Sequence, residues 1–155
     1  MKTALIIFAV LIVALVIALF FLAATSRDGE APGLVEGRLA KCPDSPNCVC
    51  SEYKDDARHY VDPIVMRHNT ASDAFQVLRE AIHTRGGKIQ SQSSHYLAAS
   101  FSSSLFGFVD DVEIRMDDKR KLIHVRSASR VGHSDFGVNR QRIERLRAIY
   151  NSKTQ

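Results

Sequence analysis

The sequence has none of the short motifs that mark common catalytic centres. It contains no G-x-S-x-G elbow around a serine nucleophile, no glycine-rich phosphate loop and no H-E-x-x-H zinc pattern. Internal repeats are absent, and the serines of residues 91–104 form the only biased tract. We therefore predict no catalytic residue, no bound metal and no cofactor, and we expect one domain of about 100 to 130 residues.

Charge, glycine and proline are all missing from residues 4–24, which read ALIIFAVLIVALVIALFFLAA. At a rise of ~1.5 Å per residue, a helix of this length spans the ~30 Å hydrocarbon layer of a membrane. A cleaved signal peptide, the alternative, has a shorter apolar core of about 7 to 15 residues. A buried soluble helix needs a polar face, which is missing here. We predict a transmembrane helix over residues 4–24 that contacts the lipid bilayer.

Few charges flank this apolar segment. Lys2 precedes it and Arg27 follows it, together with two acids. The positive-inside rule places residues 1–3 in the cytoplasm and the domain in the periplasm or at the cell exterior, anchored in the cytoplasmic (inner) membrane. Residues 25–40 are expected to be a linker, with Ser26 to Gly37 as a short tether.

Basic residues are scarce in the middle of the chain and common near its end. From Arg27 to Ile114 there are 9 basic and 13 acidic residues, whereas from Arg115 to Gln155 there are 11 basic and 4 acidic residues. Such a basic region suits nucleic acid, lipid headgroups or an acidic ligand. Because the domain is expected outside the cytoplasm, we predict no nucleic acid, and a small anionic ligand or an envelope protein as the partner.

Three cysteines lie in the segment KCPDSPNCVCS, residues 41–51. Cys42 and Cys48 enclose five residues, two of them proline, and a disulfide between them would stabilise the domain by about 2 to 3 kcal/mol in an oxidising compartment. Cys50 is then left over. Three unpaired thiols, or a metal site that uses all three, are the alternatives, but the spacing C-x5-C-x-C matches no common zinc or iron–sulfur pattern.

Hydrophobic periodicity predicts a helix that begins after Thr70 and ends at Gly86. Thr70 and Asp73 form a pattern like a capping box, and glycine commonly follows the last turn of a helix. The apolar stripe at helical spacing consists of Ala74, Phe75, Leu78, Ala81 and Ile82.

Strands are predicted over residues 59–66, 88–93, 95–102, 108–116 and 122–129, the first at an edge because of Pro63. A last helix is predicted over 137–150, with 151–155 frayed. Short polar connections favour antiparallel pairing. The predicted fold class is α+β: residues 41–150 form an antiparallel sheet of about four to five strands with two helices packed on one face, after a single transmembrane helix.

The last two strands predict a polar face. If residues 117–120 form the hairpin loop, Asp111 lies opposite Arg126 and Glu113 lies opposite His124. These four side chains would then share the face away from Val112 and the other apolar residues of the hairpin, whereas a slip by one residue would separate them.

The last helix places Asn139 and Arg142 on its buried side, together with its apolar residues Val138, Ile143, Leu146, Ile149 and Tyr150. A buried arginine needs a partner, so we expect Arg142 to meet Asp110, Asp135 or an anionic ligand.

These charges permit several interpretations. A structural network of ion pairs is favoured. The others are an anion or ligand site built from Arg126, Arg130, Asn139 and Arg142, a cation site from Asp110, Asp111 and Glu113 with His133 and Asp135, and catalysis. Asp110, Asp111, Glu113 and Asp135 are the candidate acidic partners of the arginines.

Three long strings resemble a known family: CPDSPNCV at 42–49, S-x-LFGFVDDVE at 103–113 and HVRSASRVGHSDFGVNR-x-RIE at 124–144. The chain resembles the bacterial and plastid family named domain of unknown function fourteen ninety-nine, over about Cys42 to Ala148. The family implies no established activity, and its members often carry a membrane or export segment. Cys50 stands where the family usually has serine, which makes disulfide exchange or intermolecular pairing further interpretations of the cysteines.

The leading hypothesis is a membrane-anchored domain outside the cytoplasm that binds a ligand or envelope partner without catalysis. The alternatives are an enzyme that grips an anionic substrate through Arg126, Arg130 and Arg142, with Asp110 or Asp111 as the acid or base, and an accessory subunit of a membrane complex.

Overall fold

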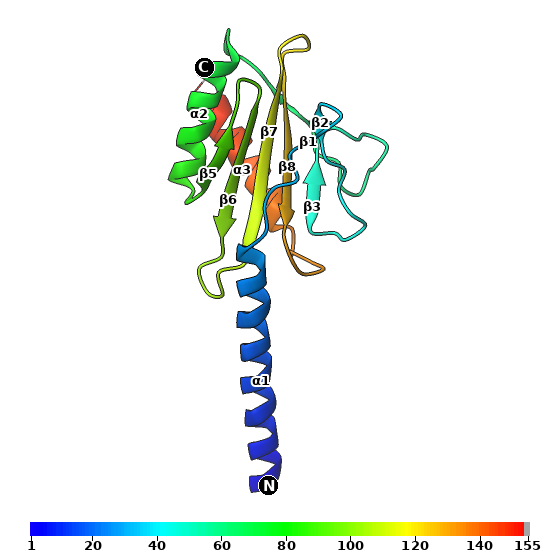
Figure 1. The fold of residues 1–155 in the computed structure, drawn as a ribbon, viewed down its shortest axis with the longest axis vertical. Coiled ribbons are helices and arrows are strands. Elements are labelled where there is room, and N and C mark those ends of the chain that lie inside the picture. Colours follow the sequence, from blue (N-terminus) through cyan, green and yellow to red (C-terminus); the bar gives the residue numbers. More distant parts are fainter. Residues whose placement is uncertain (154–155) are drawn as a thin grey trace.

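The structure, a computed structural model, describes residues 1–153 as a long N-terminal helix below an α+β domain (Figure 1). The elements in chain order are α1 (Lys2–Arg27), β1 (Leu34–Val35), β2 (Arg38–Leu39), β3 (Cys48–Cys50), β4 (Ile64–Val65), α2 (Ala71–Thr84), β5 (Lys88–Gln92), β6 (Tyr96–Ser102), β7 (Val109–Asp117), β8 (Leu122–Ser129) and α3 (Val138–Ser152).

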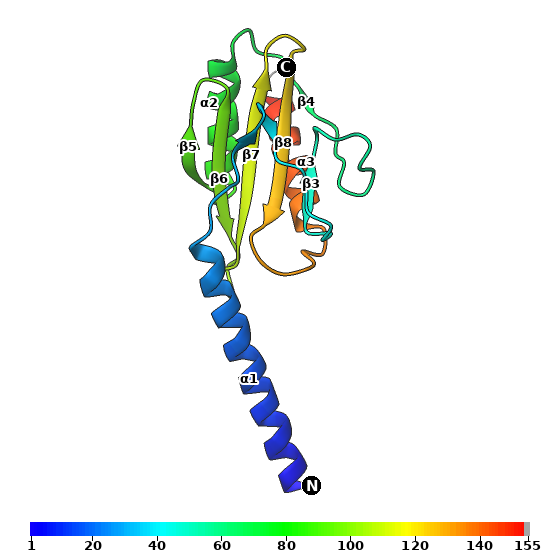
Figure 2. The same ribbon diagram turned by 45° about the vertical axis from the view of Figure 1, so that its right-hand side comes forward.

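The main sheet has six antiparallel strands in the order β3-β8-β7-β6-β5, with β4 pairing β8 off this path. Helices α2 and α3 lie behind this sheet, and the blue segment that follows α1 crosses in front of it (Figure 2). The α+β class with two helices on one face is therefore confirmed. The sheet has more strands than predicted because β3 lies in the proline-rich cysteine segment, which reads as a loop.

The side of the sheet toward α2 and α3 holds the main apolar core. Alternate residues of each strand point there, so that Leu97, Val112, Ile114 and Val125 are buried on one face. The predicted stripe of α2 is buried in full against them.

The boundaries of α2 follow its capping residues. Thr70 Oγ1 accepts a hydrogen bond from the Asp73 amide at 3.2 Å, as the capping pattern predicts. At the other end, Gly87 packs so closely that a Cβ there would lie 2.6 Å from both Ile82 and the Phe101 ring. Only glycine fits where the chain turns back from α2 into β5.

The predicted strand over residues 59–66 is mostly irregular. Only Ile64–Val65 pairs with β8, and Tyr60 forms an isolated bridge with Cys50. Pro63 lacks an amide hydrogen, which limits the ladder to the short piece that follows it.

The β7–β8 hairpin differs from the prediction by two residues. Its turn lies at residues 118–121, with Lys121 at φ 53°, so Glu113 pairs with Arg126, and Asp111 pairs with Ala128. The predicted pairs of Asp111 with Arg126 and of Glu113 with His124 are wrong. Because side chains alternate with period two, this shift leaves the predicted face intact.

The ends of α3 also differ from the prediction. Val138 is 45% exposed rather than buried, and the helix continues through Ser152 instead of ending at Tyr150. Part of the tail predicted to fray, residues 154 and 155, lies outside the described residues.

Residues 28–40, named here the strap, connect α1 to the domain. They belong to the segment that was predicted to be a linker, residues 25–40. Residues 28–40 lie along the face of the sheet opposite the helices and include the small β1–β2 hairpin (Figure 2). This face is the one predicted to be polar.

Candidate functional site

The strap-covered face brings together the four side chains that the sequence grouped: Asp111 and Glu113 from β7, and His124 and Arg126 from β8. All four are buried. Buried charges need partners, and the strap and neighbouring strands supply most of them.

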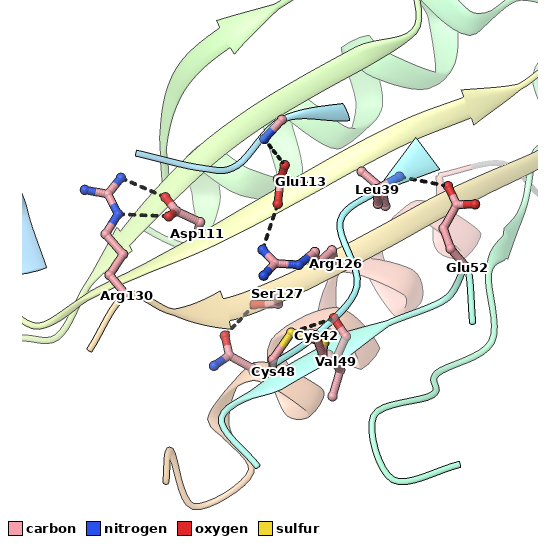
Figure 3. A network of polar contacts seen from close by, with 12 residues as sticks. Leu39, Cys42, Cys48, Val49, Glu52, Asp111, Glu113, Arg126, Ser127 and Arg130 are labelled. Carbon is pink, nitrogen blue, oxygen red and sulfur yellow. Dashed lines mark hydrogen bonds and ion pairs between the residues drawn. A yellow bond between two sulfur atoms is a disulfide. The ribbon is translucent and has the colours of Figure 1, made fainter. Parts of the chain in front are cut away.

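Glu113 is the most enclosed of these groups, with no exposed surface. Its carboxylate accepts a hydrogen bond from Arg126 Nη1 at 2.8 Å (Figure 3). It also accepts hydrogen bonds from the Tyr96 hydroxyl at 2.8 Å and the Gly33 amide at 3.0 Å. Burial, and then this bond to Glu113, raise the pKa of Tyr96. Glu113 therefore joins β6, β8 and the strap at one point.

Asp111 forms a two-pronged pair with Arg130, at 2.9 Å to Nε and 2.7 Å to Nη2 (Figure 3). The remaining Nη1 of Arg130 donates to the carbonyl oxygens of Ser26 at 3.2 Å and Arg27 at 3.3 Å. These carbonyls lie in the last turn of α1, where no further helical amide follows. Arg130 thus links the end of α1 to the sheet.

Glu52 is a third buried carboxylate, and it was not among the predicted site residues. It contacts Arg115 Nε at 2.6 Å and Arg38 Nε at 3.0 Å, and it accepts from the Leu39 amide at 3.3 Å. Burial alone would raise the pKa of Glu52, but the bonds from Arg115 and Arg38 outweigh it, and the net pKa lies below its usual value. Glu52 holds the second half of the strap.

The predicted Cys42–Cys48 disulfide is present, with an S–S distance of 1.99 Å. Cys50 is a free, buried thiol, and burial raises its pKa to about 11. A thiol in this state is a poor nucleophile, so its surroundings give no support to disulfide exchange. The three cysteines pack with Ala128 of β8 and with Leu39 of the strap.

The remaining predicted site residues, Asp110, Asp135, Asn139 and Arg142, lie on the helix side of the sheet. Arg142 Nη2 donates to Asp110 at 2.6 Å, and Asp110 is one of the two acids predicted as its partner. Asp135 has a different role, because it accepts from the amides of Asn139 at 2.7 Å and Gly137 at 3.0 Å at the start of α3. Asn139 donates to the Asn47 carbonyl at 2.9 Å and is buried.

The structure therefore divides the candidate anion residues. Arg126 and Arg130 lie on the strap side and are paired with acids, whereas Asn139 and Arg142 lie on the helix side. Asp110 and Asp111 point to opposite faces, each toward its own arginine. Within residues 1–153, no group of three His, Cys, Asp or Glu side chains lies close enough to hold a metal ion.

A hollow of about 260 Å³ opens between α3, the end of α2 and the ends of β6 and β7. Three arginines and one acid line it: Arg85, Arg142, Arg145 and Asp110. Asp110 is already paired with Arg142, whose guanidinium also lies 4.8 Å from the centre of the Phe101 ring. Within the described chain, Arg85 and Arg145 have no acidic partner, so the hollow carries excess positive charge.

A family model described as "Protein of unknown function (DUF1499)" matches residues 38–149, which is more than half of the chain. The chain belongs to the DUF1499 family. The resemblance seen in the sequence is therefore confirmed. No curated protein matches the chain.

The DUF1499 match covers the whole main sheet, α2 and most of α3. It includes Arg38 and Glu52, and therefore the ion pair that holds the second half of the strap. It excludes α1, whose last carbonyl oxygens accept hydrogen bonds from Arg130. It also excludes Gly33, whose amide donates to Glu113. The Gly33 amide and the last carbonyls of α1, which are partners of the buried ionic groups, therefore come from outside the matched region.

Proposed function

We propose that this DUF1499 protein is a single-pass membrane protein whose domain faces the periplasm or cell exterior and binds an anionic ligand without catalysis. The hollow beside Arg85, Arg142 and Arg145 is the observation that carries the binding proposal. A phosphate or carboxylate group suits it, because guanidinium groups form charge-assisted hydrogen bonds with such oxygens.

Membrane anchoring is supported by α1. Among the described residues, this helix alone is long and apolar enough to cross a membrane, and its apolar window is not buried in the domain. The outward orientation is supported by Lys2 before the helix and by the Cys42–Cys48 disulfide, since structural disulfides persist in oxidising compartments. An activity reporter fused after Gln155 that worked only in the cytoplasm would overturn this orientation.

Catalysis is a weaker interpretation because the candidate acids are already engaged. Asp110 is bonded to Arg142, and Asp111 is buried and bonded through both oxygens to Arg130. A carboxylate held in this way is a poor general base, since taking a proton would break its ion pair.

Ligand binding is tested by thermal unfolding of the full-length protein in detergent, with sodium phosphate or with sodium chloride at equal ionic strength. We expect phosphate to raise the unfolding temperature, because a ligand that binds only the folded state stabilises it by mass action. The double variant Arg85→Gln/Arg145→Gln should lose this shift.

The matched control is Arg79→Gln/Arg120→Gln, which removes two exposed arginines away from the hollow and should keep the shift. Equal shifts in the two double variants would show non-specific binding and contradict the proposed site. So would the absence of a shift in the wild type with phosphate, sulfate or a phosphate monoester.

A further inference from the structure

We infer that the α1 end of the domain is a lipid-contact surface, in which residues 103–107 and 131–137 enter the outer part of the bilayer. This inference rests on the membrane-spanning part of the proposed function and is independent of the anion site. It concerns the domain itself, beyond the helix that anchors it.

The first observation is the depth of the β6–β7 loop. The ring of Phe106 lies 5.2 Å from the ring of Phe20, edge to face. Phe20 precedes Ala24, the last residue of the apolar run, by four residues, or about 6 Å along a helix axis. If α1 spans the bilayer, the Phe106 ring lies level with Phe20, one turn closer to the N-terminus than the end of the apolar run, and therefore in the outer edge of the hydrocarbon layer.

The second observation is that this depth is fixed by specific contacts. Arg27 Nη2 donates to the Phe106 carbonyl at 3.3 Å, and the Ser26 hydroxyl accepts from the Val109 amide at 3.1 Å. Gly107 has φ +77°, and a Cβ there would lie 2.7 Å from Arg27 Nη2. The loop therefore binds the last turn of α1, and Arg130 donates to carbonyl oxygens of the same turn.

The third observation is the exposure of apolar side chains on the two loops. Leu105 is 74% exposed and Phe136 is 93% exposed. Phe136 also has φ 53°, a conformation that bulky residues seldom adopt. Exposure of a phenyl ring to water is unfavourable and does not offset the strain of this backbone conformation. A lipid interface, in contrast, favours aromatic and leucine side chains.

The arrangement of the elements places both loops at one end. In both ribbon views the yellow-green loop between β6 and β7 and the orange loop between β8 and α3 extend past the upper end of α1 toward its N-terminus (Figures 1 and 2). The β7–β8 turn lies at the opposite end of the sheet. Lipid is the occupant that fits, because the Phe106 ring packs directly on Phe20, which belongs to the apolar run of α1.

The absence of tryptophan from the chain permits a direct depth measurement. Single substitutions Leu105→Trp and Phe136→Trp introduce one fluorophore each into the full-length protein. The protein is reconstituted in phosphatidylcholine and phosphatidylglycerol vesicles whose lipids carry bromine either high on the acyl chain or near the bilayer centre. Leu15→Trp serves as the deep reference, and Lys119→Trp, in the β7–β8 turn, serves as the water reference.

We expect tryptophan at 105 and at 136 to emit at shorter wavelength than at 119, and to be quenched more by shallow than by deep bromine. Tryptophan at 15 should show the reverse order of quenching, and tryptophan at 119 none. Unchanged unfolding temperatures will show that the exposed substitutions leave the fold intact.

Two results would overturn the inference. Emission at 105 and 136 that matches the emission at 119 would mean that the loops stay in water. Blue-shifted emission without bromine quenching would mean that protein covers the loops. If tryptophan at 15 is quenched in either case, the anchoring part of the proposed function stands and the lipid-contact surface alone fails; loss of quenching at 15 would refute anchoring itself.

Discussion

The two faces of the sheet are both buried, but by different chemistry. Toward α2 and α3, strands β6 to β8 present Leu97, Ile114 and Val125, and the helices cover them with apolar stripes. Toward the strap, the same strands present Glu113 and Arg126, and the cover is extended chain that offers backbone amides.

The two faces should therefore respond differently to amino-acid substitutions. An apolar core accepts many residues of suitable volume, because the hydrophobic effect has no direction. On the strap face, each buried charge depends on particular partners, and the loss of one leaves another without compensation. We therefore expect a truncating substitution to be costly on either face, and on the strap face we expect removal of the partner charge to restore part of the lost stability.

The largest expected effect comes from Glu113→Ala. This change leaves Arg126 buried without its carboxylate and removes the acceptor of the Gly33 amide, so the free energy of unfolding should fall by about 3 to 5 kcal/mol. On the helix face, Leu78→Ala should cost a similar ~2 to 5 kcal/mol through the cavity it creates. Urea unfolding of the full-length protein in detergent measures both.

Removal of the partner charge tests this view of the strap face. The double variant Glu113→Gln/Arg126→Met removes both charges and keeps an acceptor for Gly33 and Tyr96, so it should be more stable than Glu113→Ala. Glu144→Gln is the matched control, because Glu144 pairs with Arg147 at the surface and should contribute less than ~1 kcal/mol. A double variant no more stable than Glu113→Ala would contradict this view of the strap face.

The same contrast explains what could be predicted from the sequence. The α2 stripe from Ala74 to Ile82 was predicted residue by residue, because helical periodicity is local. The polar face was predicted although the hairpin register was wrong by two residues, since a shift of two preserves the face. The roles of Glu52 and Gly33 were not predicted, because their partners come from distant segments and no local pattern encodes such pairing.

A smaller effect is expected from the Cys42–Cys48 disulfide, which staples the edge of the strap face. Reduction should lower the free energy of unfolding by about 2 kcal/mol, because the disulfide closes a short loop and removes little entropy from the unfolded chain. Unfolding with and without dithiothreitol measures this difference. Cys50→Ala should keep the whole difference, whereas Cys42→Ser/Cys48→Ser should abolish it; a difference that disappears with Cys50→Ala would mean that the buried thiol takes part in the pairing.

The smallest expected effect is a pH dependence from His124, also on the strap face. Its Nδ1 lies 3.2 Å from the Ser51 hydroxyl, and its Nε2 has no hydrogen-bond partner within residues 1–153. Burial, aided by nearby Arg115 and only partly opposed by Glu52 and Asp117, lowers the pKa of His124.

Below the unfolded histidine pKa of about 6.5, the unfolded chain binds a proton at His124 that the folded state does not bind. The free energy of unfolding therefore falls as the pH falls from about 6.5 toward the lower pKa of folded His124. One such group contributes at most about 1.4 kcal/mol per pH unit. We expect unfolding measured from pH 7.5 to pH 5 to show a shallower loss of stability for His124→Gln than for the wild type, because the variant has no proton to exclude. His83→Gln, on the exposed side of α2, should keep the wild-type slope. Equal slopes for all three proteins would mean that His124 can carry its charge in the folded state. The strap face would then tolerate an unpaired buried charge, contrary to what the fully paired carboxylates of Glu113 and Glu52 indicate.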